Sequence, residues 1–143
     1  MSDRTGGAGG LDLYVATRAT RSSPWGPALP FIYRSIDDEH QPSLSADGLE
    51  LYFTKAGPAD RDIWVSTRSL PTELWGAPGP VSEVNPPLDD GSPAVSGDGT
   101  RLMLARRSLG GTSPDWWTYR RGGLGQPWGL FRTGSSTSPA LRA

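Results

Sequence analysis

Apolar and polar residues alternate over short runs along much of this chain. In LELYFT, residues 49–54, Leu49, Leu51 and Phe53 face one way and the residues between them face the other. A period of two is typical of a β-strand with one face in a core. No apolar pattern with a 3.6-residue period occurs, and prolines interrupt every long stretch. The pattern predicts an all-β chain with no helix of three turns or more.

One fifteen-residue phrase occurs three times. It is DLYVATRATRSSPWG at 12–26, DIWVSTRSLPTELWG at 62–76 and DWWTYRRGGLGQPWG at 115–129, so its first aspartate recurs at spacings of 50 and 53 residues. A second phrase occurs twice, as HQPSLSADGLELYF at 40–53 and as GSPAVSGDGTRLML at 91–104. Independent landmarks that share one period indicate a repeat architecture.

Each repeat unit divides into four expected strands. The first, PSLS or PAVS, ends in an Asp-Gly turn at 47–48 or 98–99, and Asp-Gly suits the positive φ of a tight hairpin. The second strand follows, then a glycine-rich loop and the third strand. A longer loop ending in Trp-Gly leads to a short fourth strand. Four antiparallel strands about every 40–50 residues are typical of a β-propeller blade.

The phrase PSLSADGLELYFT, followed by DIWVSTR, resembles the WD40-like propeller repeat of the TolB type. The motif of that family centres on Pro-x-x-Ser-x-Asp-Gly, then a β run, then Asp with two apolar residues and Val. The matching residues are Pro42, Ser45, Asp47 and Gly48 in one copy and Pro93, Ser96, Asp98 and Gly99 in the other. The resemblance covers roughly residues 1–130. Proteins of this type serve as periplasmic binding proteins, as domains beside peptidases and as secreted proteins of uncharacterised role.

The resemblance implies a partial β-propeller of about three four-stranded antiparallel blades, the first of them incomplete. The expected units are 1–36, with third and fourth strands only, then 37–87, then 88–132. A tail at 133–143 follows, in which SPAL at 138–141 is similar to the first strand of a further blade. Exposed blade faces would favour self-association, most simply as a two-fold dimer.

Two sets of large side chains recur in register with the repeat: the tryptophans Trp25, Trp75 and Trp128, each followed by glycine, and the arginines Arg18, Arg68 and Arg121. Packing requires the same residue of every blade. We therefore predict that each indole covers apolar area between blades, that the glycine permits the turn into the outer strand, and that the arginines pair with acids between blades. The alternative is a ring of exposed indoles that stack on sugars or peptides.

Acidic residues precede the first strand of both complete units, in DDEH at 37–40 and DDG at 89–91. In a propeller of this family the first strand lies nearest the axis. The candidate ligand-binding residues at the mouth of a central channel are therefore Asp38, Glu39, His40, Asp89 and Asp90. Converging oxygen ligands would favour Ca²⁺, the one cofactor considered, or a cationic ligand. The alternative interpretation is that these acids cap turns and solvate a loop.

No catalytic constellation is recognisable. His40 is the single histidine, a hydrolase triad needs Ser, His and an acid in mutual reach, and no Gly-x-Ser-x-Gly motif is present. The chain has no cysteine, which excludes disulfides and thiolate metal sites. Its formal net charge of −1 does not favour a nucleic-acid partner, and no apolar run is long enough to span a membrane.

We therefore expect a non-catalytic propeller-repeat protein that binds a small-molecule, glycan or protein ligand. The alternative is a fragment of a glycan-active or peptidase-associated propeller enzyme whose catalytic residues lie outside this chain. A third interpretation is a fragment with no separate function. The first ten residues show no basic segment followed by an apolar one, so no secretion signal is recognised. Proteins that the chain resembles are often periplasmic or secreted, and the compartment stays open.

Overall fold

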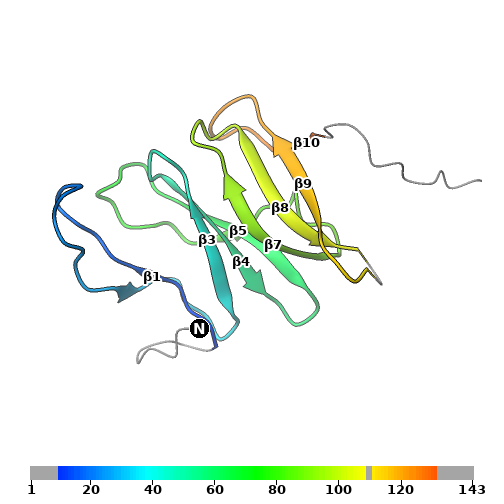
Figure 1. Cartoon of the computed structure of the whole chain (residues 1–143), viewed down its shortest axis with the longest axis horizontal. Coiled ribbons are helices and arrows are strands. Elements are labelled where there is room, and N and C mark those ends of the chain that lie inside the picture. Colours follow the sequence, from blue (N-terminus) through cyan, green and yellow to red (C-terminus); the bar gives the residue numbers. More distant parts are fainter. Residues whose placement is uncertain (1–9, 109–110, 132–143) are drawn as a thin grey trace, which may run out of the picture.

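The structure, a computed structural model, describes residues 10–108 and 111–131, and these ranges form antiparallel sheets without a helix (Figure 1). The prediction of an all-β chain is confirmed for these residues. Within the same ranges, no helix is long and apolar enough to cross a membrane. The tail at 133–143, with the SPAL segment, lies outside the described residues.

Three sheets follow one another along the chain. The first pairs β1 (Tyr14–Val15) with β2 (Leu29–Pro30). The second has the order β3 (Glu39–Leu44), β4 (Glu50–Ala56), β5 (Arg61–Thr67) and β6 (Gly79–Pro80). The third has the same arrangement, with β7 (Asp89–Val95), β8 (Arg101–Arg107), β9 (Asp115–Arg120) and β10 (Gly129–Leu130). The strand order within each sheet is therefore the order of the sequence.

The two Asp-Gly turns form the hairpins expected of them. Gly48 and Gly99 have φ angles of +73° and +67°, which only glycine adopts without strain. In the second sheet, Ser45 Oγ donates to Asp47 Oδ1 at 2.6 Å. The equivalent hydrogen bonds in the third sheet lower the pKa of Asp98 to about 2. The repeated motif is thus a self-contained turn.

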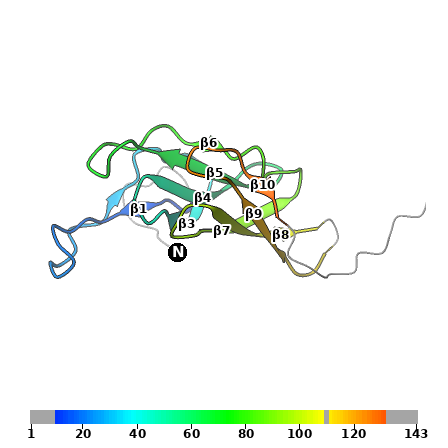
Figure 2. The ribbon, with the colours of Figure 1, turned by 90° about the horizontal axis from the view of Figure 1, so that it is seen from above.

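The sheets stand side by side in chain order, and Figure 2 shows this order from above. Residues alternate between the two faces of β4, as the sequence pattern predicts. Leu51 and Phe53 pack against the first sheet, while Tyr52 packs toward the third. The core between the first and second sheets contains Leu13, Phe31, Leu51 and Phe53. The core between the second and third sheets contains Tyr52, Ile63, Val81, Val84, Leu102, Leu104, Tyr119 and Trp128.

A repeated arginine-tryptophan contact lies between the sheets. The guanidinium of Arg121 lies 4.3 Å from the ring centre of Trp128, and its two terminal nitrogens donate to the carboxylate of Glu50 at 2.9 and 2.6 Å. Trp128 meets Tyr52 of the second sheet edge to face, with ring centres 6.2 Å apart. The prediction that a recurring arginine pairs with an acid of the neighbouring sheet is confirmed for Arg121. The equivalent Arg68 instead donates to the backbone oxygens of Gly48 and Glu73.

The burial of the three equivalent tryptophans differs, and here the sequence prediction needs correction. Trp128 is 7% exposed and Trp75 is partly buried against Phe31, but Trp25 is 63% exposed. Each indole covers the sheet that precedes it in the chain. The described residues contain no sheet ahead of β1 for Trp25 to cover. Trp25 contacts the guanidinium of Arg18, which lies 4.5 Å from its ring centre.

The glycines after Trp25 and Trp75 are favoured by a close backbone approach and not by a positive φ angle. Neither Gly26 nor Gly76 has a positive φ angle, so neither is needed for an unusual turn. Instead, Gly76 N donates to Thr67 O at 2.8 Å, and a Cβ on Gly76 would lie 3.0 Å from that oxygen. Glycine is required there because two backbone segments approach closely.

Candidate functional site

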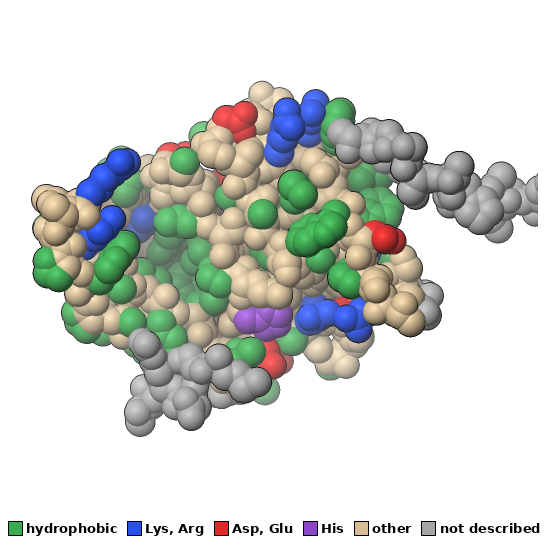
Figure 3. Space-filling view, in the orientation of Figure 1, with side chains coloured by type: hydrophobic (Ala, Val, Ile, Leu, Met, Phe, Trp, Pro, Cys, Tyr) green, Lys and Arg blue, Asp and Glu red, His purple; other side chains and the backbone are tan. Residues whose placement is uncertain are grey.

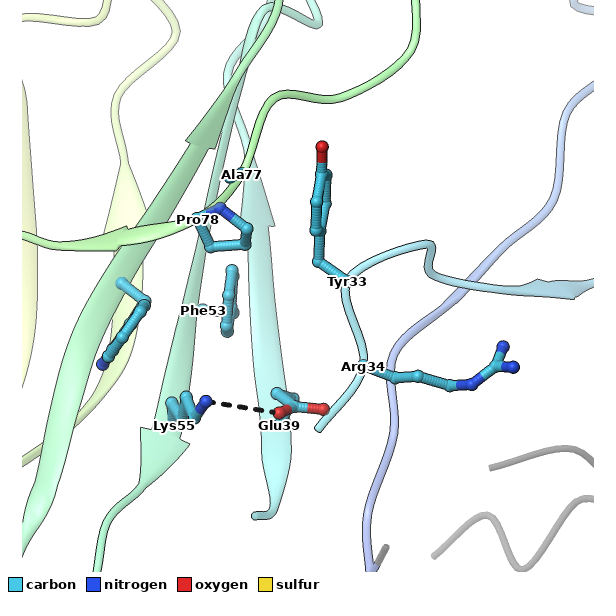
Figure 4. Close-up of a pocket in the computed structure, with 8 residues that line it drawn as sticks. Tyr33, Arg34, Glu39, Phe53, Lys55, Ala77 and Pro78 are labelled. Atoms are coloured by element: carbon cyan, nitrogen blue, oxygen red, sulfur yellow. Dashed lines mark ion pairs between the residues drawn. The ribbon is translucent and has the colours of Figure 1, made fainter. Parts of the chain in front are cut away.

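A cavity of about 280 Å³ opens between the first and second sheets (Figure 4). One wall comes from the segment between β2 and β3, and the other from β4, β5 and the loop before β6. The lining residues are Tyr33, Arg34, Glu39, Phe53, Lys55, Trp64, Ala77 and Pro78. Three aromatic rings and one charged pair therefore surround the same space, which is the usual composition of a small-ligand site.

The polar part of the pocket is Lys55 and its two carboxylate neighbours. Lys55 Nζ lies 3.4 Å from Asp37 Oδ2 and 3.9 Å from Glu39 Oε1, and 4.8 Å from the ring centre of Trp64. Both oxygen distances exceed the roughly 2.7–2.9 Å of a charge-assisted hydrogen bond. Lys55 can therefore still donate to a ligand oxygen in the pocket.

Glu39 is held more firmly than Lys55. Its side chain is 2% exposed, and it accepts hydrogen bonds from both the hydroxyl and the backbone N–H of Ser35. Since Ser35 belongs to the segment that forms the outer wall, this carboxylate attaches that wall to β3. Glu39 thus positions the wall and supplies negative charge beside Lys55.

The aromatic side of the pocket is rigid. Phe53 is buried, and its ring meets Phe31 edge to face with ring centres 6.2 Å apart. Phe31 in turn meets Tyr33 in the same way at 6.0 Å. Because these rings hold one another, a ligand would meet a preformed apolar surface at little cost in side-chain entropy.

The next interface along the chain has chemically similar residues in equivalent places, and most of them are buried there. Lys55, Glu39 and Phe53 correspond, 51 residues later, to Arg106, Asp90 and Leu104, and Trp64 corresponds to Trp117 at a spacing of 53. Arg106 donates to Asp90 Oδ1 at 2.7 Å, to Tyr119 Oη at 3.1 Å and to the carbonyl oxygen of Val84, and its guanidinium lies 4.7 Å from the Trp117 ring centre. All of these groups are engaged within the protein.

The segments that follow β2 and β6 explain the difference. Phe31 N donates to Leu13 O, and Val81 N donates to Ile63 O in the same way. Phe31 and Val81 are therefore equivalent, and three residues later Arg34 is the equivalent of Val84. Val84 is fully buried, whereas Arg34 is exposed and its side chain points away from Lys55 and Phe53 in Figure 4. The repeat therefore leaves space at one interface that it fills at the other.

Two of the sequence-predicted site residues join neighbouring sheets. Asp38 Oδ1 accepts the backbone N–H of Leu11 at 2.7 Å. At the equivalent place, Asp89 accepts from the backbone N–H of Arg61 at 3.3 Å and from its Nε at 2.7 Å. The guanidinium of Arg61 lowers the pKa of the Asp89 carboxyl. Both aspartates thus fasten the start of a first strand to the preceding sheet.

The other three predicted residues lie in different surroundings. Asp90 is fully buried beside Arg106, and burial raises its pKa while Arg106 acts in the opposite direction. Glu39 belongs to the pocket. His40 lies on β3, opposite Thr54 of β4, and reaches the surface in Figure 3. In residues 10–108 and 111–131, no three His, Cys, Asp or Glu side chains are grouped as metal ligands would be.

Sequence reasoning named Glu39 of the pocket but missed its other lining residues. Lys55, Phe53 and Trp64 read as ordinary strand residues, because their alternation fits the repeat. A signal was present at Arg34, where the segment before DDEH carries a charge and the segment before DDG carries Val84. A departure from the repeat, rather than the repeat itself, indicates the site.

Comparison with known proteins gives little support for any activity. No family model matches the chain. A D-inositol 3-phosphate glycosyltransferase of Stackebrandtia nassauensis is similar over 71 residues, at 34% identity. The similar region covers 49% of this chain and 15% of that glycosyltransferase, so the chain spans only a small part of that protein's length.

Proposed function

We propose that this chain is a section of a WD40-like β-propeller that binds a ligand and does not catalyse a reaction. Two observations support the propeller: sheets of identical strand order stand side by side, and the first strands β3 and β7 lie against each other. Gln41 Oε1 accepts the backbone N–H of Ser92 at 2.9 Å, which joins these two strands. In a propeller the first strands would line the axis.

The ligand site is the pocket beside Lys55. The observation that carries this proposal is that the same space is closed at the next interface, where Val84 is buried, and open here. An aromatic-lined pocket that is open at one copy of a repeat, while most of the equivalent residues at the other copy are buried, supports a ligand site.

Ligand-observed NMR with a small panel of probes tests this function. The panel contains N-acetylglucosamine, choline and N-acetyl-valine amide, and the matched variants are Lys55→Met and Arg107→Met. Arg107 is an exposed cation outside the pocket. We expect at least one probe to bind the wild type and Arg107→Met equally, and Lys55→Met at least about tenfold more weakly. If no probe binds, or if Lys55→Met leaves the affinity of every probe unchanged, the proposed ligand site is wrong.

Turnover tests the non-catalytic part separately. The same protein is incubated with 4-nitrophenyl glycosides and with casein, and we expect no product above a heat-denatured control. Hydrolysis that disappears in Lys55→Met would contradict a purely binding role and favour the glycan-active or peptidase-associated alternative.

We also propose that the outer face of the third sheet is a self-association surface. Trp116 and Met103 are 65% and 42% exposed there, while Ile63 and Tyr52 at the corresponding places of the second sheet are buried. Apolar surface of this kind favours association. Sedimentation velocity at rising concentration should show dimers that Trp116→Lys abolishes. A wild-type chain that stays monomeric throughout contradicts this surface.

A further inference from the structure

At the closed interface, between the second and third sheets, a side chain of the chain itself fills the space that corresponds to the pocket. Val84 is fully buried. It belongs to the same apolar cluster as Leu104, and Trp117 packs against that cluster. Its backbone carbonyl accepts a hydrogen bond from Arg106 Nη2. One branched aliphatic side chain and one neutral carbonyl therefore satisfy this interface.

The pocket presents the counterparts of these partners. Three lining residues have equivalents at the closed interface. The equivalent pairs are Phe53 and Leu104, Trp64 and Trp117, and Lys55 and Arg106. Arg34, the counterpart of Val84, turns outward (Figure 4). The pocket thus has the surfaces that contact the Val84 side chain and carbonyl at the closed interface. It has no aliphatic side chain in the place of Val84.

We propose that the pocket binds a peptide segment with a branched aliphatic side chain, in the manner in which the third sheet receives Val84. The aliphatic side chain packs against Phe53 and Trp64, which are neighbours on one face of the second sheet, and the carbonyl oxygen of the same residue accepts a hydrogen bond from Lys55 Nζ. This inference rests on the proposed binding function and names the ligand class for that site.

The charges around Lys55 favour a neutral acceptor over an anion. Two carboxylates, Asp37 and Glu39, lie within 3.4 and 3.9 Å of its ammonium group. A ligand carboxylate beside Lys55 would meet both, and like charges at such distances repel. A peptide carbonyl accepts from Lys55 without that repulsion. A sugar hydroxyl would do the same, but it would leave the aromatic walls without a branched apolar group.

The first test uses the chain's own segment as the probe. An N-acetylated, C-amidated peptide with the sequence of residues 82–87, SEVNPP, is titrated by isothermal calorimetry, beside a peptide with aspartate in place of the valine. We expect saturable one-to-one binding of the first peptide and a loss of about tenfold or more for the second, because a buried valine contributes about 1.5 kcal/mol or more. Equal binding of both peptides overturns the proposal.

The second test closes the pocket from within. The double variant Arg34→Val/Ser35→Asn restores the pair Val84 and Asn85 of the closed interface, and Arg34→Lys is the matched control. We expect the double variant to lose at least about tenfold in peptide affinity and to unfold at a higher urea concentration, while Arg34→Lys changes neither. A double variant that folds and binds the peptide as tightly as the wild type overturns the proposal.

Two further results keep the inference distinct from the proposed function. Trp64→Ala should weaken binding of the SEVNPP peptide about tenfold. Trp25→Ala, which changes an exposed tryptophan outside the pocket, should leave the peptide affinity unchanged. These two variants test the proposal if the double variant does not fold. If N-acetylglucosamine or choline binds in a Lys55-dependent way and the peptide does not, the peptide inference fails and the binding function stands. If neither the panel nor the peptide binds, both fail.

Discussion

The two interfaces between the three sheets follow one plan with different outcomes. Between the second and third sheets, Arg106 has four polar or aromatic partners and Val84 fills the remaining space. Between the first and second sheets, Lys55 lies at ion-pair distance from its acids, and the space stays open. The repeat therefore specifies the residues on both sides of each interface. One side chain, Val84 or Arg34, decides whether a pocket remains between them.

The largest expected effect separates the two cations. Arg106 and Asp90 are almost completely buried, so Arg106→Met leaves a buried carboxylate without its partner and should lower the free energy of unfolding by about 3–5 kcal/mol. Lys55→Met removes a partly exposed ion pair with Asp37 and a longer contact, 3.9 Å, with the buried Glu39. Because Glu39 keeps its two hydrogen bonds from Ser35, the free energy of unfolding should change by about 1 kcal/mol or less. Urea unfolding followed by circular dichroism measures both. Equal losses would break the distinction between a closed and an open interface.

The equivalent tryptophans give the next test. Trp128→Ala should destabilise the protein by roughly 3–5 kcal/mol, because its ring is buried against Tyr52. Trp25→Ala should stay within about 0.5 kcal/mol, because that ring covers no described sheet. Trp75→Ala should fall between the two. If Trp25→Ala proves as costly as Trp128→Ala, the first tryptophan has a packing partner that the described residues do not show.

Alkaline pH should weaken the closed interface selectively. Burial raises the pKa of Tyr52 to about 12. A raised folded-state pKa contributes stability that is complete below the unfolded value, about 10, and is lost as the pH rises toward 12. The loss should be on the order of 2 kcal/mol. Urea midpoints between pH 9 and about 12 should fall less in Tyr52→Phe than in the wild type, and parallel curves would contradict the assignment.

The smallest effect concerns the glycines after the tryptophans. A Cβ on Gly76 would lie 3.0 Å from Thr67 O, and one on Gly129 would lie 3.6 Å from Arg120 O. Gly76→Ala must displace backbone and should cost about 1 kcal/mol or more, whereas Gly129→Ala should stay within about 0.5 kcal/mol. Thermal unfolding of both variants measures the difference. A reversed order would contradict the close backbone approach as the reason for glycine at position 76.

Much of the fold was readable from particular residues. The alternation in LELYFT correctly placed Leu51 and Phe53 on one face of β4 and Tyr52 on the other, and the structure buries both faces. The Asp-Gly turns formed at the two predicted places. The pairing of a recurring arginine with an acid of the neighbouring sheet held for Arg121, with Glu50 of the second sheet. These features succeed because each depends on a residue type at a fixed spacing, which a repeat displays several times.

The site was less predictable. Asp38 and Asp89 were candidates for a channel mouth, but their carboxylates bind Leu11 and Arg61 of the preceding sheet. Each aspartate and its partner are 27 or 28 residues apart in the sequence, so no local sequence pattern predicts these contacts. The exposure of Trp25 was also missed, because its repeat position is identical to that of the buried Trp128.

The sequence by itself determined the strands, their turns and the repetition of the sheets, because these follow from residue periodicity, glycine and short-range hydrogen bonds. Only the tertiary structure decided which repeated residues are buried and which line a pocket. Burial depends on what the neighbouring sheet places opposite a residue. Arg34 and Val84 occupy equivalent places, yet the charge of Arg34 draws it toward water and leaves the space that Val84 fills elsewhere.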